Sequence, residues 1–102
     1  MTKTIQLFTL AALTSLISGC GGPSDFTPSE GMTAVEIYNS ACADCHGDNG
    51  AGKFGFLFKI AGSDDSVEEM AATIKEGGTI MPSFPNLSDE QRLMMAGYIK
   101  TF

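Results

Sequence analysis

Two cysteines and a histidine lie within five residues of one another near the middle of the chain, in the order Cys42-Ala-Asp-Cys45-His46. Side chains three residues apart lie on one face of a helical turn, so both sulfur atoms can reach the same edge of a flat ring. The imidazole that follows is then carried toward the centre of that ring. C-x-x-C-H is the attachment signature of a c-type haem, with a thioether from each cysteine and iron ligation by the histidine. The rest of the chain must therefore enclose a porphyrin.

Other uses of this pattern fit the sequence less well. His46 is the only histidine of the chain, so one copy cannot supply two histidine ligands to iron. A structural zinc site would be one ligand short with two cysteines and one histidine. A thiol–disulfide protein remains an alternative, although the β-α-β pattern expected around such a motif is missing.

The first twenty residues have the features of an export signal. Lys3 precedes an apolar run over 5–17, which has the length of a signal-peptide core and is too short to span a bilayer. The run leads into Ile17-Ser18-Gly19-Cys20, which resembles the bacterial lipoprotein lipobox and implies cleavage before Cys20 and acylation of that cysteine. We therefore expect a lipoprotein-type signal peptide over 1–19 and a lipidated N-terminus with a flexible tether over 20–29. An ordinary signal peptide cut nearby and an uncleaved anchor are the alternatives.

The size and charge of the remaining chain limit what it can do. Cleavage before Cys20 leaves 83 residues. A domain this small usually needs a cofactor, metal or disulfide to complete its core, so we expect the chain without haem to be poorly folded. This part carries five Lys or Arg against twelve Asp or Glu, a formal charge of −7. Such a charge disfavours nucleic-acid binding and favours redox protein partners with basic docking patches, unless it serves solubility alone.

Three capping boxes predict where helices begin, because a Ser or Thr side chain and the Glu or Gln three residues later satisfy each other's backbone N–H groups. The last helix must pack on another one, and the first helix is its natural partner, with Gly97 permitting close approach. The boxes are Thr33 with Glu36, Ser66 with Glu69 and Ser88 with Gln91, and they predict helices from about 30 or 33 to 43, from 66 to the Gly77-Gly78 break, and from 88 to about 100.

Between the first two helices, a glycine-rich loop and an apolar cluster follow the C-x-x-C-H motif. The loop over 47–55 fits part of a phosphate-binding motif, but Phe54 stands where Ser or Thr is required and no strand precedes it, so we interpret it as a turn-rich loop beside the haem. The cluster is expected to lie against the porphyrin, with a short buried strand as the alternative. Its members are Phe54, Phe56, Leu57, Phe58 and Ile60.

A second iron ligand is expected from a methionine, whose thioether with histidine on the other face gives a six-coordinate haem of raised reduction potential. Met70, Met94 and Met95 fall at core spacing within predicted helices, and Met32 lies beside the haem-bearing helix. Met81 lies outside the helices, after the glycine break and directly before Pro82, on a loop that proline stiffens. Met81 is therefore the predicted axial ligand.

Taken together, the motif Cys42–Gly47, Met81-Pro82 and the segment from Leu87-Ser88 to Tyr98-Ile99 resemble a small bacterial class I monohaem cytochrome c. The resemblance implies an all-α fold of three to five helices around one covalently bound haem c, with the N- and C-terminal helices packed crosswise over 30–102. It implies that Tyr38 and Tyr98 meet at that crossing, with Met95 on the haem side. It also implies a backbone carbonyl that accepts the His46 ring proton, and the matching place is Gly55.

These features predict a one-electron carrier, not an enzyme: a monomeric cytochrome, lipid-anchored outside the cytoplasm to a bacterial membrane, that shuttles electrons between respiratory or photosynthetic complexes. The sequence contains no second histidine, no nucleophile beside a base and no pair of carboxylates in a believable pocket, so nothing in it suggests substrate turnover. A fixed haem subunit of an extracytoplasmic oxidoreductase complex is an alternative. A haem-based sensor, which needs a labile sixth ligand, is another.

Overall fold

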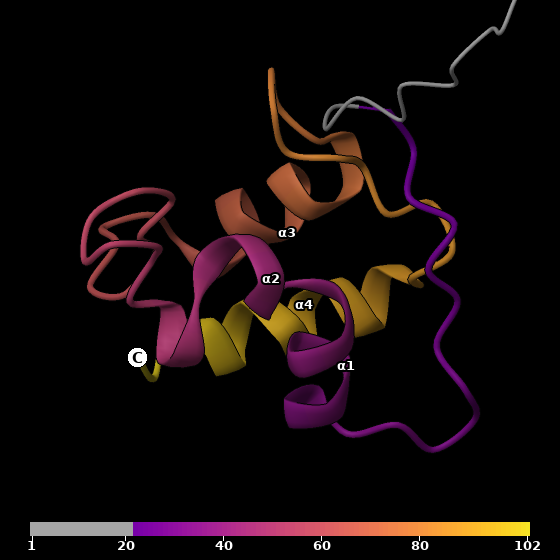
Figure 1. The fold of residues 1–102 in the computed structure, drawn as a ribbon. Coiled ribbons are helices and arrows are strands. Elements are labelled where there is room, and N and C mark those ends of the chain that lie inside the picture. Colours follow the sequence, from indigo (N-terminus) through magenta and orange to yellow (C-terminus); the bar gives the residue numbers. More distant parts are fainter. Residues whose placement is uncertain (1–21) are drawn as a thin grey trace, which may run out of the picture.

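Four α-helices and one short 3-10 helix make up the regular structure of residues 22–102, the part of the chain that the computed structural model describes (Figure 1). Within this part, the only β-type pairings are two isolated bridges, which confirms the all-α prediction. The expected signal peptide over 1–19 and the expected lipidation site Cys20 lie outside the described residues. In chain order the elements are α1 Ala34–Ala41, α2 Ala43–His46, η1 Asp48–Gly50, α3 Val67–Glu76 and α4 Asp89–Ile99.

All three predicted capping boxes are formed, and each starts a helix where the sequence placed it. In each one the N-cap hydroxyl accepts from the backbone N–H three residues on, and that residue's side chain accepts from the N-cap backbone. At α1, the hydrogen bonds from Thr33 hold the pKa of the Glu36 carboxyl below its ordinary value. The boxes are Thr33 with Glu36, Ser66 with Glu69 and Ser88 with Gln91.

The first predicted helix is broken in two at Cys42. Its backbone φ of −120° departs from helical geometry, and this residue both ends α1 and caps α2. The prediction of one continuous helix to Ala43 is therefore wrong. The break turns the chain so that the four-residue α2, which carries Cys45 and His46, leaves α1 in a new direction.

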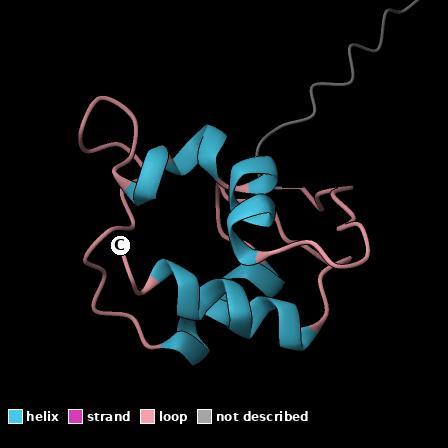
Figure 2. Ribbon diagram, turned by 90° about the horizontal axis from the view of Figure 1, so that it is seen from below, coloured by secondary structure: helices cyan, strands magenta, loops and turns pink. Residues whose placement is uncertain are grey.

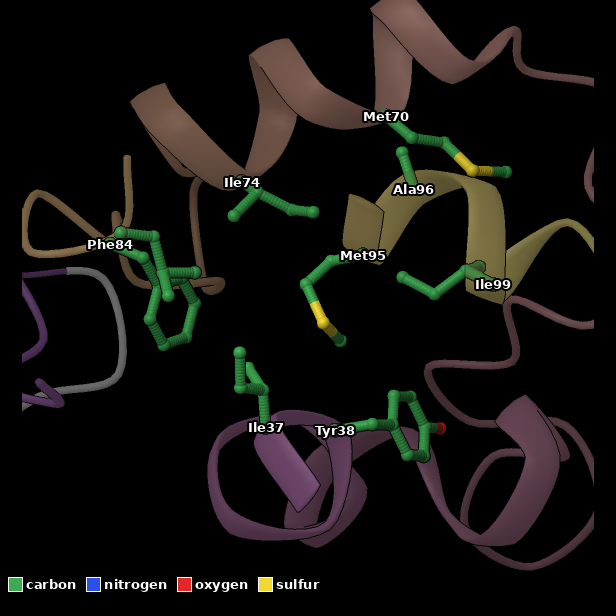
Figure 3. Close-up of a cluster of buried hydrophobic side chains, with 9 residues drawn as sticks. Ile37, Tyr38, Met70, Ile74, Phe84, Met95, Ala96 and Ile99 are labelled. Atoms are coloured by element: carbon green, nitrogen blue, oxygen red, sulfur yellow. The ribbon is translucent and has the colours of Figure 1, made fainter. Parts of the chain in front are cut away.

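The C-terminal helix α4 contacts both α1 and α3, as the views in Figures 1 and 2 show. The contact with α1 confirms the predicted pairing, and the rings of Tyr38 and Tyr98 meet edge to face with centroids 5.9 Å apart. The role predicted for Gly97 is wrong, because a Cβ atom there would meet nothing within 4 Å. Ala96, the residue before it, has no exposed surface and lies near Met70 of α3 (Figure 3).

The core lies between α1, α3 and α4 (Figure 3). Met95 of α4 points from that helix toward Ile37 and Tyr38 of α1, and these three side chains are the largest that are fully buried. Met95 thus occupies the centre of the helical core. The other buried apolar residues are Met70, Ile74, Phe84, Leu87, Ala96 and Ile99.

Residues 23–27, which we call the N-terminal strap, are attached to the domain, where the sequence predicted a flexible tether. Pro23 forms a parallel bridge with Ser83, and the Ser24 N–H donates to the Ser83 carbonyl at 2.8 Å. Phe26 is half-buried and packs against the core. The composition of this segment is typical of a linker, but tertiary contacts hold it in place.

Candidate haem site

Backbone hydrogen bonds place the two motif cysteines on one helical turn. The N–H groups of Cys45 and His46 both donate to the Cys42 carbonyl, at 3.2 and 3.0 Å. Cys42 is half-buried and Cys45 exposed, and both are free thiols. Burial raises the pKa of the Cys42 thiol to about 11, with a further contribution from Cys45. A thiol held protonated at neutral pH is a poor nucleophile, which disfavours the thiol–disulfide alternative.

His46 is oriented by a backbone carbonyl other than the one that the resemblance to a class I cytochrome c implied. The ring Nδ1 lies 2.6 Å from the carbonyl oxygen of Phe58, and a proton on Nδ1 donates to it. This arrangement leaves the lone pair of Nε2 available to a metal. The acceptor is therefore the Phe58 carbonyl, and the prediction that the Gly55 carbonyl accepts this proton is wrong. No side-chain signal could have located the acceptor, because any residue type offers the same carbonyl group.

Tyr38 joins helix α1 to the loop after the motif. Its hydroxyl donates to the Gly47 carbonyl at 2.6 Å and accepts from the Gly50 N–H at 3.0 Å, and both of these glycines are buried. Burial raises the pKa of this phenol, so the donor proton stays in place. A buried tyrosine hydroxyl usually needs a partner. The sequence analysis gave Tyr38 only a packing role and missed this link to the histidine loop.

Gly47 also permits a close approach of the chain behind the histidine. Its φ of 74° is left-handed, and a Cβ there would lie 2.5 Å from the Gly52 carbonyl oxygen. The Gly52 N–H in turn donates to the His46 carbonyl at 2.6 Å. A side chain at position 47 would therefore displace the loop that follows His46.

Two adjoining cavities, both open to solvent, have three lining residues in common: Cys42, His46 and Met81. Their linings are otherwise mainly apolar, as suits a porphyrin. All four predicted attachment and ligand residues thus line the first cavity. The exposed Cys45 is the one that does not also line the second. The first cavity is also lined by Ala41, Cys45, Phe58, Ile80, Pro82 and Phe84, and the second by Ile60, Ser63, Asp65, Met70, Thr73, Ile74 and Ile99.

The other methionines are placed less well to reach iron. Met32 Sδ already accepts the Ser29 N–H at 3.2 Å. Met94 is 40% exposed, and Met95, expected on the haem side, lines neither cavity. Met70 lines the second cavity only. Among the methionines of residues 22–102, Met81 alone lines both cavities.

The apolar cluster after the glycine loop is divided between the cavity and the solvent. Phe58 lines the first cavity and Ile60 the second, as predicted. Phe54, Phe56 and Leu57 are 90%, 74% and 42% exposed and line neither cavity, so the prediction is wrong for these three residues. Phe54 and Phe58 both have positive φ, near 54° and 59°, in a tight turn that turns Phe54 outward. Apolar character predicted the cluster but not the direction of each ring.

The donor set fits haem c better than a bare metal ion. Two thiols on one turn, an imidazole with a free Nε2 and a thioether all border the first, largely apolar cavity. Among residues 22–102, no group of three or more His, Cys, Asp or Glu side chains is arranged to hold a metal ion.

None of the helices within residues 22–102 has both the length and the apolar character that a membrane span requires.

Comparison with known proteins shows the family of the chain. Residues 29–99 match the family model "Cytochrome C oxidase, cbb3-type, subunit III". The chain belongs to this family of small monohaem cytochrome c domains. It is an electron-transfer protein, as the sequence predicted, and the family implies a covalent haem c. Cytochrome c-550 of Bacillus subtilis is 42% identical over 48 residues, which are 47% of this chain and 40% of that protein.

Solved structures show the same cytochrome c fold. The KustC0563 c-type cytochrome superposes with a TM-score of 0.58 at 23% identity, covering 70% of this chain and 98% of that one. Cytochrome c6 from the diatom Phaeodactylum tricornutum gives a TM-score of 0.55 at 24% identity, covering 65% and 85%. These structures confirm a compact helical cytochrome c fold with its terminal helices in contact.

Proposed function

We propose that this cytochrome carries single electrons through a haem c bound by thioethers to Cys42 and Cys45 and ligated by His46 and Met81. The observation that carries this proposal is that Cys42, His46 and Met81 all line both apolar cavities. Bound haem would supply reversible one-electron chemistry at iron, with histidine–methionine ligation raising the reduction potential.

The chain's own residues would hold the ligands still and keep water away. The hydrogen bond from His46 Nδ1 to the Phe58 carbonyl fixes the imidazole orientation and raises its basicity. Phe58, Phe84 and Ile74 supply apolar walls to the cavities. A rigid, dry site limits rearrangement when the charge on the cofactor changes, which favours rapid electron transfer.

We propose further that Cys20 is acylated and holds the domain outside the cytoplasm at a bacterial membrane. The support is the Ile17-Ser18-Gly19-Cys20 pattern and its preceding apolar run. Because Pro23 is paired with Ser83, only Gly21 and Gly22 separate Cys20 from a fixed point on the domain, and three residue-to-residue steps join the two. Three extended residues span at most about 11 Å, so the Met81 side of the domain would stay close to the bilayer.

Redox proteins with basic docking patches are the proposed partners of this monomer. The charge of −7 after Cys20 would steer such partners and make association slower as salt rises. Nucleic acid is not expected to bind, because the chain lacks the necessary excess of positive charge.

The iron ligation is tested by replacing Met81 with alanine in the mature holoprotein. The oxidised variant is expected to lose the methionine-to-iron charge-transfer absorption at the red end of the spectrum, which we call the red methionine band. It is also expected to bind imidazole or cyanide tightly. Met70→Leu is the matched control, since Met70 lines one of the same cavities, and it should keep the band. A Met81→Ala protein with an unchanged spectrum would show that another group is the ligand. Strong ligand binding by the unaltered protein would instead favour the sensor alternative.

A fixed haem subunit of an oxidoreductase complex is the second candidate, and the family description, which names an oxidase subunit, favours it. The chain matches 40% of the length of the curated relative, cytochrome c-550. Detergent extraction from native membranes followed by size separation distinguishes the two. A mobile carrier should elute alone, whereas a subunit should co-elute with a larger enzyme and its additional cofactors.

A further inference from the structure

The N-terminal strap lies along the outer side of the loop that carries Met81. Besides the pairing of Ser24 with Ser83, the Asn86 side-chain amide donates to Thr27 Oγ1 at 3.1 Å and to the Asp25 carbonyl at 3.5 Å. These contacts join residues about 60 positions apart in the sequence. The strap therefore holds this loop at two places, two and five residues beyond Met81.

Helices α3 and α4 hold the inner side of the same loop. The Phe84 N–H donates to the Ile74 carbonyl at 3.0 Å, and Arg92 Nη2 donates to the Phe84 carbonyl at 3.0 Å. The Gly78 N–H donates to the carbonyl of Met81 itself at 2.9 Å. The carbonyl of Ser83, which lies between these fixed points, is held by the strap. Met81 is thus secured from both sides, and the strap supplies one of them.

Side chains of the strap alternate in burial, which shows that it is seated on the domain. Ser24 and Phe26 are half-buried, and Asp25 and Thr27 are exposed. This period of two is that of an extended segment with one face on a surface. Phe26 packs against the core and the Ser24 hydroxyl accepts the Phe26 N–H at 3.2 Å.

We propose that the N-terminal strap is a positioning element for the sixth iron ligand, because it keeps the loop closed with Met81 against the haem. This inference rests on the proposed ligation by Met81. The strap lies before residue 29, where the family match begins. Detachment of the strap would free the Ser83 carbonyl and the Asn86 amide and let the loop open more often.

Loop opening can be measured as competition between Met81 and an external ligand. The apparent affinity for imidazole equals its intrinsic affinity multiplied by the fraction of molecules in which the methionine is displaced. Loss of one hydrogen bond changes such an equilibrium about two- to ten-fold. Loosening the strap should therefore tighten apparent imidazole binding by that factor, without any change at the haem itself.

Ser24→Pro in the oxidised holoprotein is the test, because proline removes the N–H that donates to Ser83 and tolerates an extended backbone. Ser24→Ala is the matched control, since it loses the hydroxyl but keeps that N–H. Imidazole titration followed by loss of the red methionine band should show binding about two- to ten-fold tighter for Ser24→Pro, and within about two-fold of the unaltered protein for Ser24→Ala. Asn86→Ala, which removes the second attachment, should also tighten binding and decides the matter if Ser24→Pro does not mature.

Two further variants separate this inference from its alternatives. Tyr38→Phe weakens the domain on the histidine side, so it should leave imidazole affinity unchanged. Equal tightening by Tyr38→Phe and by the strap variants would show a merely global effect and overturn the inference. Unchanged affinity in both Ser24→Pro and Asn86→Ala, with tight binding in Met81→Ala, would refute the role of the strap while keeping the ligation. Unchanged affinity in Met81→Ala would refute the ligation and the inference with it.

Discussion

Replacing Tyr38 with phenylalanine should cost far more than the loss of one oxygen atom suggests. The substitution removes the acceptor of the Gly50 N–H and the donor to the Gly47 carbonyl, both of which are buried. A buried backbone group left without a partner costs about 1–3 kcal/mol. The Gly50 N–H and the Gly47 carbonyl keep only a long hydrogen bond to each other, at 3.3 Å, so the expected loss in the free energy of unfolding is about 1–3 kcal/mol.

Tyr98→Phe provides a matched control for this measurement. The two rings pack against each other and against Phe102, but the Tyr98 hydroxyl forms no hydrogen bond with any group of residues 22–102, and Tyr98 is half-buried. The same atom is therefore removed without orphaning a backbone group. The expected change is within about 0.5 kcal/mol.

Guanidinium unfolding of the two oxidised holoproteins, followed by haem absorbance, measures both values. The free energies are compared at equal slope, so that a change in midpoint reports stability. If Tyr38→Phe and Tyr98→Phe agree within about 0.5 kcal/mol, the hydroxyl is not the link between α1 and the histidine loop, and the reasoning from buried partners fails.

Three other substitutions test local features of the fold. Phe54→Asn should raise the free energy of unfolding by about 0.5–1 kcal/mol in denaturant titration, because asparagine tolerates the positive φ of 54° at this exposed site, and a clear loss would contradict this. Gly77→Ala should lower the free energy of unfolding by about 2 kcal/mol or more and weaken the methionine-to-iron band, because φ is 73° and a Cβ would lie 2.8 Å from the Met81 carbonyl oxygen. Gly78→Ala is the control, since a Cβ at that position has room. Equal effects of the two substitutions would refute the contact. Glu36→Gln should reduce the loss of unfolding free energy on acidification. The pKa of the Glu36 carboxyl is lowered in the folded state, so its contribution to stability is present above its ordinary value of 4.5 and disappears as pH falls through the folded value. Identical curves of stability against pH for the two proteins would argue against this.

Local patterns predicted the helices well because the interactions behind them are local. A capping box joins residues three apart, so Thr33, Ser66 and Ser88 could be read as helix starts without knowledge of the fold. The position of Met81, outside any helix and before Pro82, likewise predicted that it would reach the site. The haem motif itself carries its spacing in five residues.

Features that depend on distant contacts could not be predicted in this way. Residues 23–27 have the composition of a linker, and only their pairing with residues 83–86 makes them a strap. The acceptor for His46 is a backbone carbonyl, which carries no residue signature. Gly97 had the right size for a helix crossing, but a Cβ atom there would meet nothing within 4 Å, so the residue lies away from the contact.

The optical spectrum of the purified protein, matured in a host that attaches haem, tests the central claim most directly. Haem that remains with the chain after acid–acetone extraction, a red methionine band when oxidised, and sharp low-spin bands when reduced are the predicted results. A colourless but compactly folded protein, or haem that is fully extracted, would contradict the account.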